Sequence, residues 1–184
     1  MKNKIGIIGA GSFGTALAIL LTNKGHDVSL WGRKKSLMSL MEEIRENPHY
    51  LPGVRLPETI RIAYSMEEAL EGAEIALFAV PAQSFRSVFS AASPYISTDM
   101  TVVNVAKGIE KTSLMRLSEI AGEILPEVPY VTLSGPSHAE EVARQLPTIV
   151  AVASKDETSD RKIQEIFNTD RFRVYTNDDI TGVE

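Results

Sequence analysis

The sequence predicts a doubly wound α/β fold, in which a mostly parallel sheet carries helices on both faces. Short apolar segments alternate with helical segments along the 184 residues, as in chains built from strand–helix–strand units. Segment 74–80 is apolar at every position after Glu74, and strands that are apolar on both sides belong to parallel sheets covered by helices. A glycine-rich turn, from Gly9 to Gly14, joins the first apolar segment to the first helical one.

The first half of the chain alternates in this way from its beginning. Strands are predicted at 4–8, 28–31, 61–64 and 74–80, and helices at 14–24, 37–46 and 82–92. Asn47-Pro48 ends the second helix, because the residue before a proline avoids helical backbone angles. Residues 47–57 contain several prolines and a glycine and are predicted to form a loop. Ser65 to Glu68 has the capping-box pattern that begins a short helix.

The second half continues the same pattern. Strands are predicted at 101–106, 130–133, 148–153 and 172–176, and helices at 113–125 and 156–168. Ser137 to Glu140 forms a second capping-box pattern, with Ser137 as the cap of a further helix. Residues 177–184 are typical of a helix N-terminus. The sequence therefore predicts a first domain over 1–176 and the start of a second, helical domain over 177–184.

Composition excludes several classes of function. The net charge is −5 without a basic stripe, so nucleic acid is not an expected partner. The chain has no cysteine, which fits a cytoplasmic location, and its three scattered histidines predict no metal site. No apolar stretch reaches the roughly 18 residues of a membrane span. A small molecule is the expected partner.

The glycine turn carries the clearest functional signal. Gly9-Ala10-Gly11-Ser12-Phe13-Gly14 matches the dinucleotide fingerprint G-x-G-x-x-G, and it lies between a strand and a helix as that motif requires. Gly9 permits the tight turn, Gly11 lets the backbone approach a pyrophosphate, and Gly14 lets the helix pack against the strand. The sequence thus predicts a Rossmann-type domain.

The end of the second strand indicates which cofactor is preferred. A carboxylate there would bind the ribose 2′-hydroxyl of NAD, but the sequence has Arg33, Lys34 and Lys35 instead. Arg33 can hold a 2′-phosphate through a bidentate contact. These cations favour NADP(H), while NAD(H) stays open, and a solvated basic turn is the simpler alternative.

The carboxyl ends of the later strands carry further candidates. Lys107 follows a buried strand, where its ammonium could polarise a carbonyl oxygen and stabilise an oxyanion. The alternative is a lysine that only extends into solvent. Ser134 to Ala139 follows the next strand and includes His138, which has no partner in the sequence and is more often structural.

Several segments together resemble the bacterial-type NAD(P)-dependent glycerol-3-phosphate dehydrogenases. They are Gly9 to Ala16, Asn47 to Gly53, Ala106 to Ile109 and Ser134 to Val142. The resemblance implies reversible reduction of dihydroxyacetone phosphate to sn-glycerol 3-phosphate, which feeds glycerophospholipid synthesis. It also implies that Lys107 lies between cofactor and substrate, that Gly135 and Ser137 bind the substrate, and that the cofactor is contacted by Ser12, Phe13, Arg33, Tyr50, Pro81 and Ala139.

The resemblance also implies residues that this sequence lacks. In the family, a helical domain follows a segment similar to Thr181 to Glu184, so a second lysine and the groups that bind the substrate phosphate are expected beyond Glu184. We therefore expect this chain to be the cofactor-binding part, inactive or weakly active alone. Apolar surface near Val152 and Val174 would then be exposed and could support a homodimer. A non-catalytic nucleotide-binding module and a dehydrogenase of another substrate are the alternatives.

Overall fold

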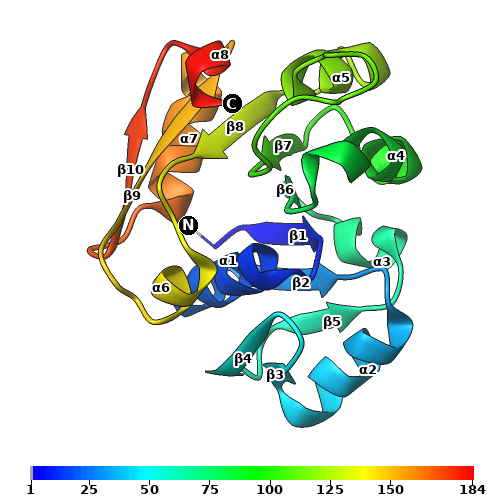
Figure 1. Ribbon diagram of the computed structural model, residues 1–184, viewed down its shortest axis with the longest axis vertical. Coiled ribbons are helices and arrows are strands. Elements are labelled where there is room, and N and C mark those ends of the chain that lie inside the picture. The colour runs from blue at the N-terminus through cyan, green and yellow to red at the C-terminus, as the bar shows by residue number, and fades with distance from the viewer. Residues whose placement is uncertain (1) are drawn as a thin grey trace.

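An eight-stranded sheet forms the centre of the computed structural model, which describes residues 2–184 (Figure 1). Its strand order is β10-β9-β8-β7-β6-β1-β2-β5. The strands are β1 Lys4–Ile8, β2 Asp27–Trp31, β5 Arg61–Ala63, β6 Ile75–Phe78, β7 Thr101–Asn104, β8 Tyr130–Ser134, β9 Thr148–Ser154 and β10 Phe172–Thr176. Neighbouring strands are parallel except β8 and β9, which confirms the predicted mostly parallel sheet.

The strand order reverses next to β1. From β1 the chain builds the sheet outward through β2 and β5, and it then crosses back to β6 on the other side of β1. Ligands of open α/β sheets bind at such a reversal, beyond the carboxyl ends of the strands. The fold therefore places a candidate site above the ends of β1 and β6.

Helices cover both faces of the sheet, as predicted. They are α1 Ser12–Asn23, α2 Lys35–Ile44, α3 Met66–Leu70, α4 Ala82–Ala92, α5 Leu117–Ile124, α6 Ala139–Ala143, α7 Glu157–Phe167 and α8 Ile180–Val183. One core joins α1, α2, α6 and α7 to sheet residues such as Ile5 and Leu77, while the other joins α3, α4 and α5 to Ile8 and Phe78. Because successive strand residues point to opposite faces, Leu77 and Phe78 serve different cores. Helix α1 is apolar nearly all round because it lies between the sheet and α6 (Figure 1).

Two predicted segments differ from the structure. Residues 47–57 are not a plain loop, because β3 Glu46–Asn47 and β4 Leu51–Arg55 pair as an antiparallel hairpin, where the Glu46 carboxylate accepts from the Gly53 amide at 2.9 Å. The helix predicted at 113–125 begins only at Leu117. Leu114 has a left-handed backbone (φ 59°), and the Glu119 carboxylate accepts from the Arg116 amide at 2.8 Å and so fixes the helix start.

The two capping-box predictions have different outcomes. Ser65 does cap α3 by accepting from the Glu68 amide at 3.0 Å, although Glu68 reaches back to Tyr64. The prediction for Ser137 is wrong. Helix α6 begins at Ala139 with His138 at its N-cap, and the Ser137 hydroxyl donates to the Gly135 carbonyl at 3.2 Å instead.

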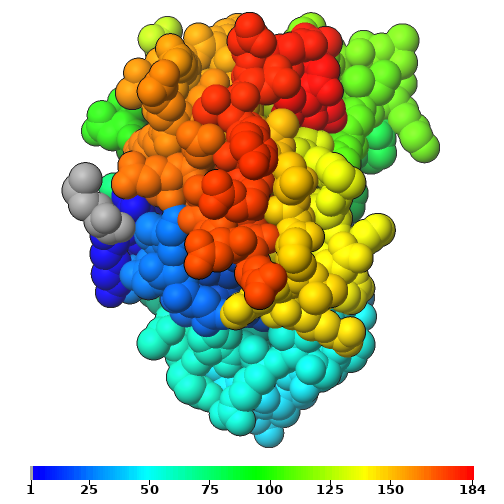
Figure 2. All heavy atoms as spheres, turned by 90° about the vertical axis from the view of Figure 1, so that its left-hand side faces the viewer, coloured from blue at the N-terminus to red at the C-terminus, as the bar shows by residue number. Residues whose placement is uncertain are grey.

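The last strands show which side chains form the apolar surface expected there. Val152 and Val174 are buried, with exposed fractions of 0% and 2%. Ile149 and Tyr175, on the opposite faces of the same two strands, are 56% and 53% exposed, so exposed apolar surface does lie near Val152 and Val174. Strand β10 forms the sheet edge and runs down the face shown in Figure 2, beside α7. Among the described residues, no helix combines the length and apolar character needed to cross a membrane.

The segment 177–184 packs against the sheet. The prediction that this segment starts a second domain did not anticipate such contacts. Helix α8 packs against β8 and β9. Sequence reasoning used Glu184 only to mark where a second lysine is expected to follow, but the structure gives it contacts within the first domain. Its side chain is 3% exposed, and its carboxylate accepts from the Ser118 amide at 2.7 Å, the Ser118 hydroxyl at 2.6 Å and the Tyr130 hydroxyl at 3.2 Å. A domain boundary at residue 176 stays a prediction.

Candidate functional site

The glycine turn between β1 and α1 is packed as tightly as the fingerprint predicts. Gly9 has a left-handed φ of 125°, and a Cβ there would lie 2.3 Å from the Ala79 carbonyl oxygen. A Cβ on Gly14 would lie 2.0 Å from the Gly9 carbonyl oxygen, so this glycine lets α1 approach β1. A Cβ on Gly11 would meet nothing within 4 Å. The turn therefore leaves open space at the position where a pyrophosphate approaches.

The start of α1 suits an anion. Gly11 occupies its N-cap position and provides no side-chain hydrogen bond to the first helical amides. Such amides, together with the positive end of the helix dipole, favour a phosphate. The residues present thus fit a dinucleotide.

A first hollow of about 280 Å³ lies on one side of the glycine turn. It contains six of the residues predicted to bind the cofactor, namely Gly9, Gly11, Arg33, Lys34, Tyr50 and Pro81. Trp31 and Val80 add apolar surface to its wall. Neither Arg33 nor Lys34 forms an ion pair within residues 2–184, so both charges are available to an anion. Lys35, the third cation of this stretch, begins α2 and does not line the hollow.

A second hollow of about 490 Å³ lies on the other side of the turn. Five predicted site residues line it, namely Ser12, Phe13, Lys107, Ser137 and Ala139. The Lys107 ammonium donates to the Gly135 carbonyl at 2.6 Å, and the Ser137 hydroxyl donates to the same oxygen at 3.2 Å. Lys107, Gly135 and Ser137 are thus brought together, although they come from two loops.

The loop after Lys107 is held against α4. Gln83 donates to the Ile109 carbonyl at 2.7 Å and accepts from the Lys111 amide at 2.9 Å. The Arg86 guanidinium contacts both oxygens of the Glu110 carboxylate at 3.0 Å. The Ser113 hydroxyl, and after it Arg86, lower the pKa of Glu110. These contacts fix the strand end from which Lys107 extends.

Glu184 contributes a second contact to this loop. Its backbone carbonyl accepts from the Gly108 amide at 3.4 Å, next to Lys107, while its carboxylate is held by Ser118 and Tyr130. Burial, and after it the Glu184 charge, raise the pKa of the Tyr130 hydroxyl well above its usual value. That hydroxyl therefore stays protonated and donates to Glu184. Within residues 2–184, Glu184 thus contacts the loop that carries Lys107 but lines neither hollow beside the glycine turn.

Asn47 is a buried polar residue that the sequence reasoning missed. Its side chain is fully buried and donates to the Ala10 carbonyl at 3.0 Å and to the Thr15 hydroxyl at 2.8 Å. Its oxygen accepts from the Tyr50 amide at 3.2 Å. In the sequence, Asn47 only signals a helix end before Pro48. The signal that could have drawn attention to it is its place within the segment Asn47 to Gly53, which carries part of the resemblance.

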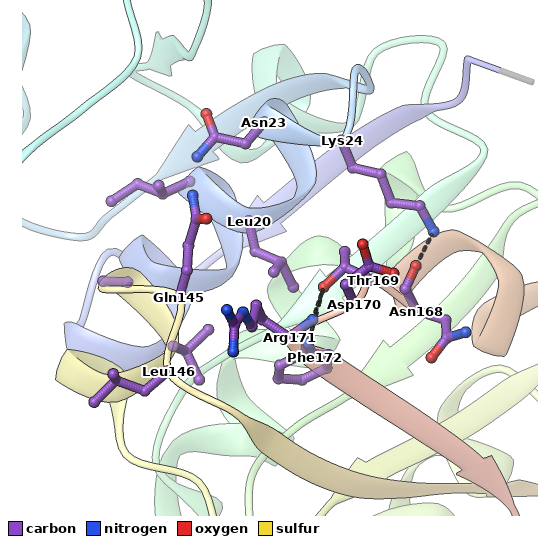
Figure 3. Close-up of a pocket in the computed structure, with 13 residues that line it drawn as sticks. Leu20, Asn23, Lys24, Gln145, Leu146, Asn168, Thr169, Asp170, Arg171 and Phe172 are labelled. Carbon is purple, nitrogen blue, oxygen red and sulfur yellow. Dashed lines mark hydrogen bonds between the residues drawn. The ribbon is translucent and has the colours of Figure 1, made fainter.

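A larger hollow of about 560 Å³ lies away from these residues, at the far end of α1 (Figure 3). A helix of this length puts it about 18 Å from the glycine turn. The Lys24 ammonium, on its wall, donates to the carbonyls of Glu165 and Asn168, and burial lowers the pKa of Lys24. None of the predicted site residues lines this hollow. Within residues 2–184, no group of three His, Asp or Glu side chains is arranged to hold a metal ion.

Comparison with known proteins agrees with this geometry. A sequence model of the family described as NAD-dependent glycerol-3-phosphate dehydrogenase N-terminus matches residues 4–160. The chain is 46% identical over 180 residues to a glycerol-3-phosphate dehydrogenase [NAD(P)+] from Clostridium tetani, covering 98% of this chain and 52% of that protein. A relative of the same name from Desulfitobacterium hafniense is 48% identical over 181 residues, covering 98% of this chain and 51% of its own length.

A solved structure is also similar. The crystal structure of glycerol-3-phosphate dehydrogenase from Coxiella burnetii superposes with a TM-score of 0.94 at 39% identity, covering 100% of this chain and 56% of that one. The chain thus spans about half the length of the curated relatives it matches. On the family match and these identities, the chain belongs to the NAD-dependent glycerol-3-phosphate dehydrogenase family, in its amino-terminal part.

Proposed function

We propose that this chain is the cofactor-binding part of an enzyme that reversibly transfers a hydride between NAD(P)H and dihydroxyacetone phosphate or sn-glycerol 3-phosphate. The observation that carries the proposal is the placement of the two hollows. Gly11 lines the first and Ser12 lines the second, so they meet at the glycine turn. A dinucleotide likewise consists of two halves that are joined at a pyrophosphate, as the two hollows are joined at the glycine turn. We assign the adenosine half to the first hollow and the nicotinamide half to the second.

The cations of the first hollow support a preference for NADP(H). Arg33 and Lys34 would bind the adenosine 2′-phosphate, and no carboxylate stands at the end of β2 to favour the NAD ribose. NAD(H) lacks that phosphate and would bind more weakly, although cations at this position do not exclude it.

Lys107 is the proposed catalytic residue of this chain. NAD(P)H, when bound, supplies the hydride. Lys107 would leave the Gly135 carbonyl and donate to the substrate carbonyl oxygen, where a fixed cation stabilises the developing oxyanion. Gly135 and Ser137 would position the substrate beside it. The resemblance assigns the proton-transferring second lysine and the phosphate-binding groups to the other half of such enzymes, beyond Glu184. For the whole protein we propose a cytoplasmic location, a role in glycerophospholipid synthesis and a homodimeric state.

A fluorescence titration of the chain with NADPH and NADH tests the cofactor assignment. Trp31 is the sole tryptophan and lines the first hollow, so energy transfer from it to the reduced cofactor reports binding. We expect tighter binding of NADPH, and we expect Arg33→Ser to reduce that difference, since Lys34 remains, while leaving NADH affinity unchanged. Equal binding of both cofactors would refute the NADP preference, and binding of neither would refute the cofactor site.

Activity is tested in a chimera in which residues 1–184 replace the matching half of the Clostridium tetani relative. We expect NADPH-dependent reduction of dihydroxyacetone phosphate, with a loss of about 100-fold or more in kcat for Lys107→Met. Lys111→Met is the matched control, since Lys111 lies in the same loop but does not line the second hollow. An active Lys107→Met chimera would contradict the catalytic role.

A further inference from the structure

The β3–β4 hairpin brings Tyr50 to the first hollow. This hairpin is a separate two-stranded sheet and contributes no strand to the eight-stranded one. Tyr50 lies in its turn, is 44% exposed and lines the hollow together with Arg33. The position of the Tyr50 ring relative to the glycine turn therefore depends on whatever attaches the hairpin to the rest of the domain.

Two attachments of the hairpin have different consequences. Leu51 is apolar, 1% exposed and part of the main core, so it anchors the hairpin through packing. Asn47 is polar and reaches the cofactor-binding backbone itself, because it donates to the carbonyl of Ala10, between Gly9 and Gly11. Its second amide hydrogen bonds the Thr15 hydroxyl in the first turn of α1.

The chemistry of these contacts specifies an amide. Ala10 and Thr15 both present acceptors, and the Tyr50 amide presents a donor. Only a side chain with two hydrogens on one end and an oxygen on the other satisfies all three. Asp would place an acceptor against the Ala10 carbonyl, and an apolar residue would leave buried polar groups unpaired. One buried side chain thus connects the glycine turn, α1 and the Tyr50 loop.

We infer that Asn47 is a positioning residue for the cofactor: its amide sets the Tyr50 loop relative to the glycine turn and so contributes to NAD(P)H affinity through Tyr50. The inference rests on the proposed cofactor site in the first hollow. Asn47 itself touches no part of that hollow, so any effect on binding passes through the residues it holds.

A double-mutant cycle on the 184-residue chain tests the inference. NADPH affinity is measured through energy transfer from Trp31 for the unaltered chain, Asn47→Ala, Tyr50→Ala and the double variant. We expect each single variant to bind about tenfold more weakly, the loss that follows from one well-placed contact. If Asn47 acts through Tyr50, the double variant binds no more weakly than the weaker single variant. A structural role alone would give losses that multiply.

A milder pair of variants serves if Asn47→Ala does not fold. Thr15→Val keeps the shape of the buried side chain but removes the acceptor for Asn47, while Thr15→Ser keeps the hydroxyl. We expect Thr15→Val to weaken NADPH binding about threefold and Thr15→Ser to restore it. Urea unfolding of each variant shows whether it is folded.

The outcomes separate this inference from the function on which it rests. Unaltered affinity in folded Asn47→Ala, full multiplication of losses in the double variant, or equal binding by Thr15→Val and Thr15→Ser would each overturn the role of Asn47. Absence of NADPH binding by the unaltered chain would instead overturn the cofactor site, and this inference with it.

Discussion

Replacing Gly14 by alanine tests whether the glycine turn depends on close contact between α1 and β1. The added Cβ would lie 2.0 Å from the Gly9 carbonyl oxygen and 3.0 Å from the Ala79 Cβ. Since carbon–oxygen contacts settle at about 3.3–3.6 Å, the start of α1 has to move by more than roughly 1 Å. Overpacking costs about 1–3 kcal/mol. The atom in contact here belongs to the backbone, which cannot move aside as easily as the end of a flexible side chain. Against this, alanine gains about 1 kcal/mol over glycine within a helix.

Because the contact is with backbone, the cost should be near the upper end, and we therefore expect Gly14→Ala to lower the free energy of unfolding by up to about 2 kcal/mol. Gly122→Ala is the matched control, because Gly122 lies within α5 and a Cβ there would meet nothing within 4 Å. That variant should gain up to about 1 kcal/mol. Urea unfolding followed by far-ultraviolet circular dichroism measures both. If Gly14→Ala proved as stable as Gly122→Ala, the inference that the turn has no room for a Cβ at position 14 would be wrong. We also expect Gly14→Ala to weaken NADPH binding, because the first amides of α1 move with the helix.

Three further predictions concern charge and pH. The affinity for NADPH should fall with added salt more steeply than that for NADH, because Arg33 and Lys34 face the extra phosphate, and equal slopes in the two titrations would contradict this. Asp156 caps α7 by accepting from the amides of Thr158 and Ser159, so Asp156→Ala should cost about 1 kcal/mol in urea unfolding, and no change would show that the cap is dispensable. Burial, and after it Lys24, lower the pKa of His26, so the unfolded chain binds the proton more readily. Stability should therefore fall as the pH drops below about 6.5, and His26→Gln should flatten that slope in unfolding measured across the range.

The architecture could be predicted because its signals are local. Strand 75–78 is apolar throughout and buried on both faces, and the sequence shows this without knowledge of its neighbours. The positions of Lys107 and Gly135 at one edge also follow, since the carboxyl ends of parallel strands meet there. The contact between them, at 2.6 Å, did not follow, because it joins residues from two separate loops.

The missed features depend on contacts between distant segments. The hairpin at Glu46 to Arg55 has strands of two and five residues with a proline in the second, so composition indicates a loop. Leu51 in the core and the buried Asn47 amide hold it in place, and that amide bonds residues 37 and 32 positions away in the sequence. The attachment of Glu184 to Ser118 is equally remote, at 66 positions. The Ser137 pattern failed because α6 begins at Ala139 with His138 at its N-cap, one residue later than the pattern requires.

The sheet and the site thus depend on different kinds of interaction. Apolar burial on both faces holds β1 and β6 side by side in the sheet, and a dinucleotide can lie beyond their carboxyl ends. The side chains that would recognise it, Tyr50 and Lys107, extend from segments outside the sheet. Polar contacts help to hold both segments, at Asn47 beside the packed Leu51 for one and at Glu110 for the other. These polar contacts are directional and few in number. Substitutions at Asn47 or Glu110 should therefore reduce ligand binding or catalysis more than they reduce the stability of the sheet.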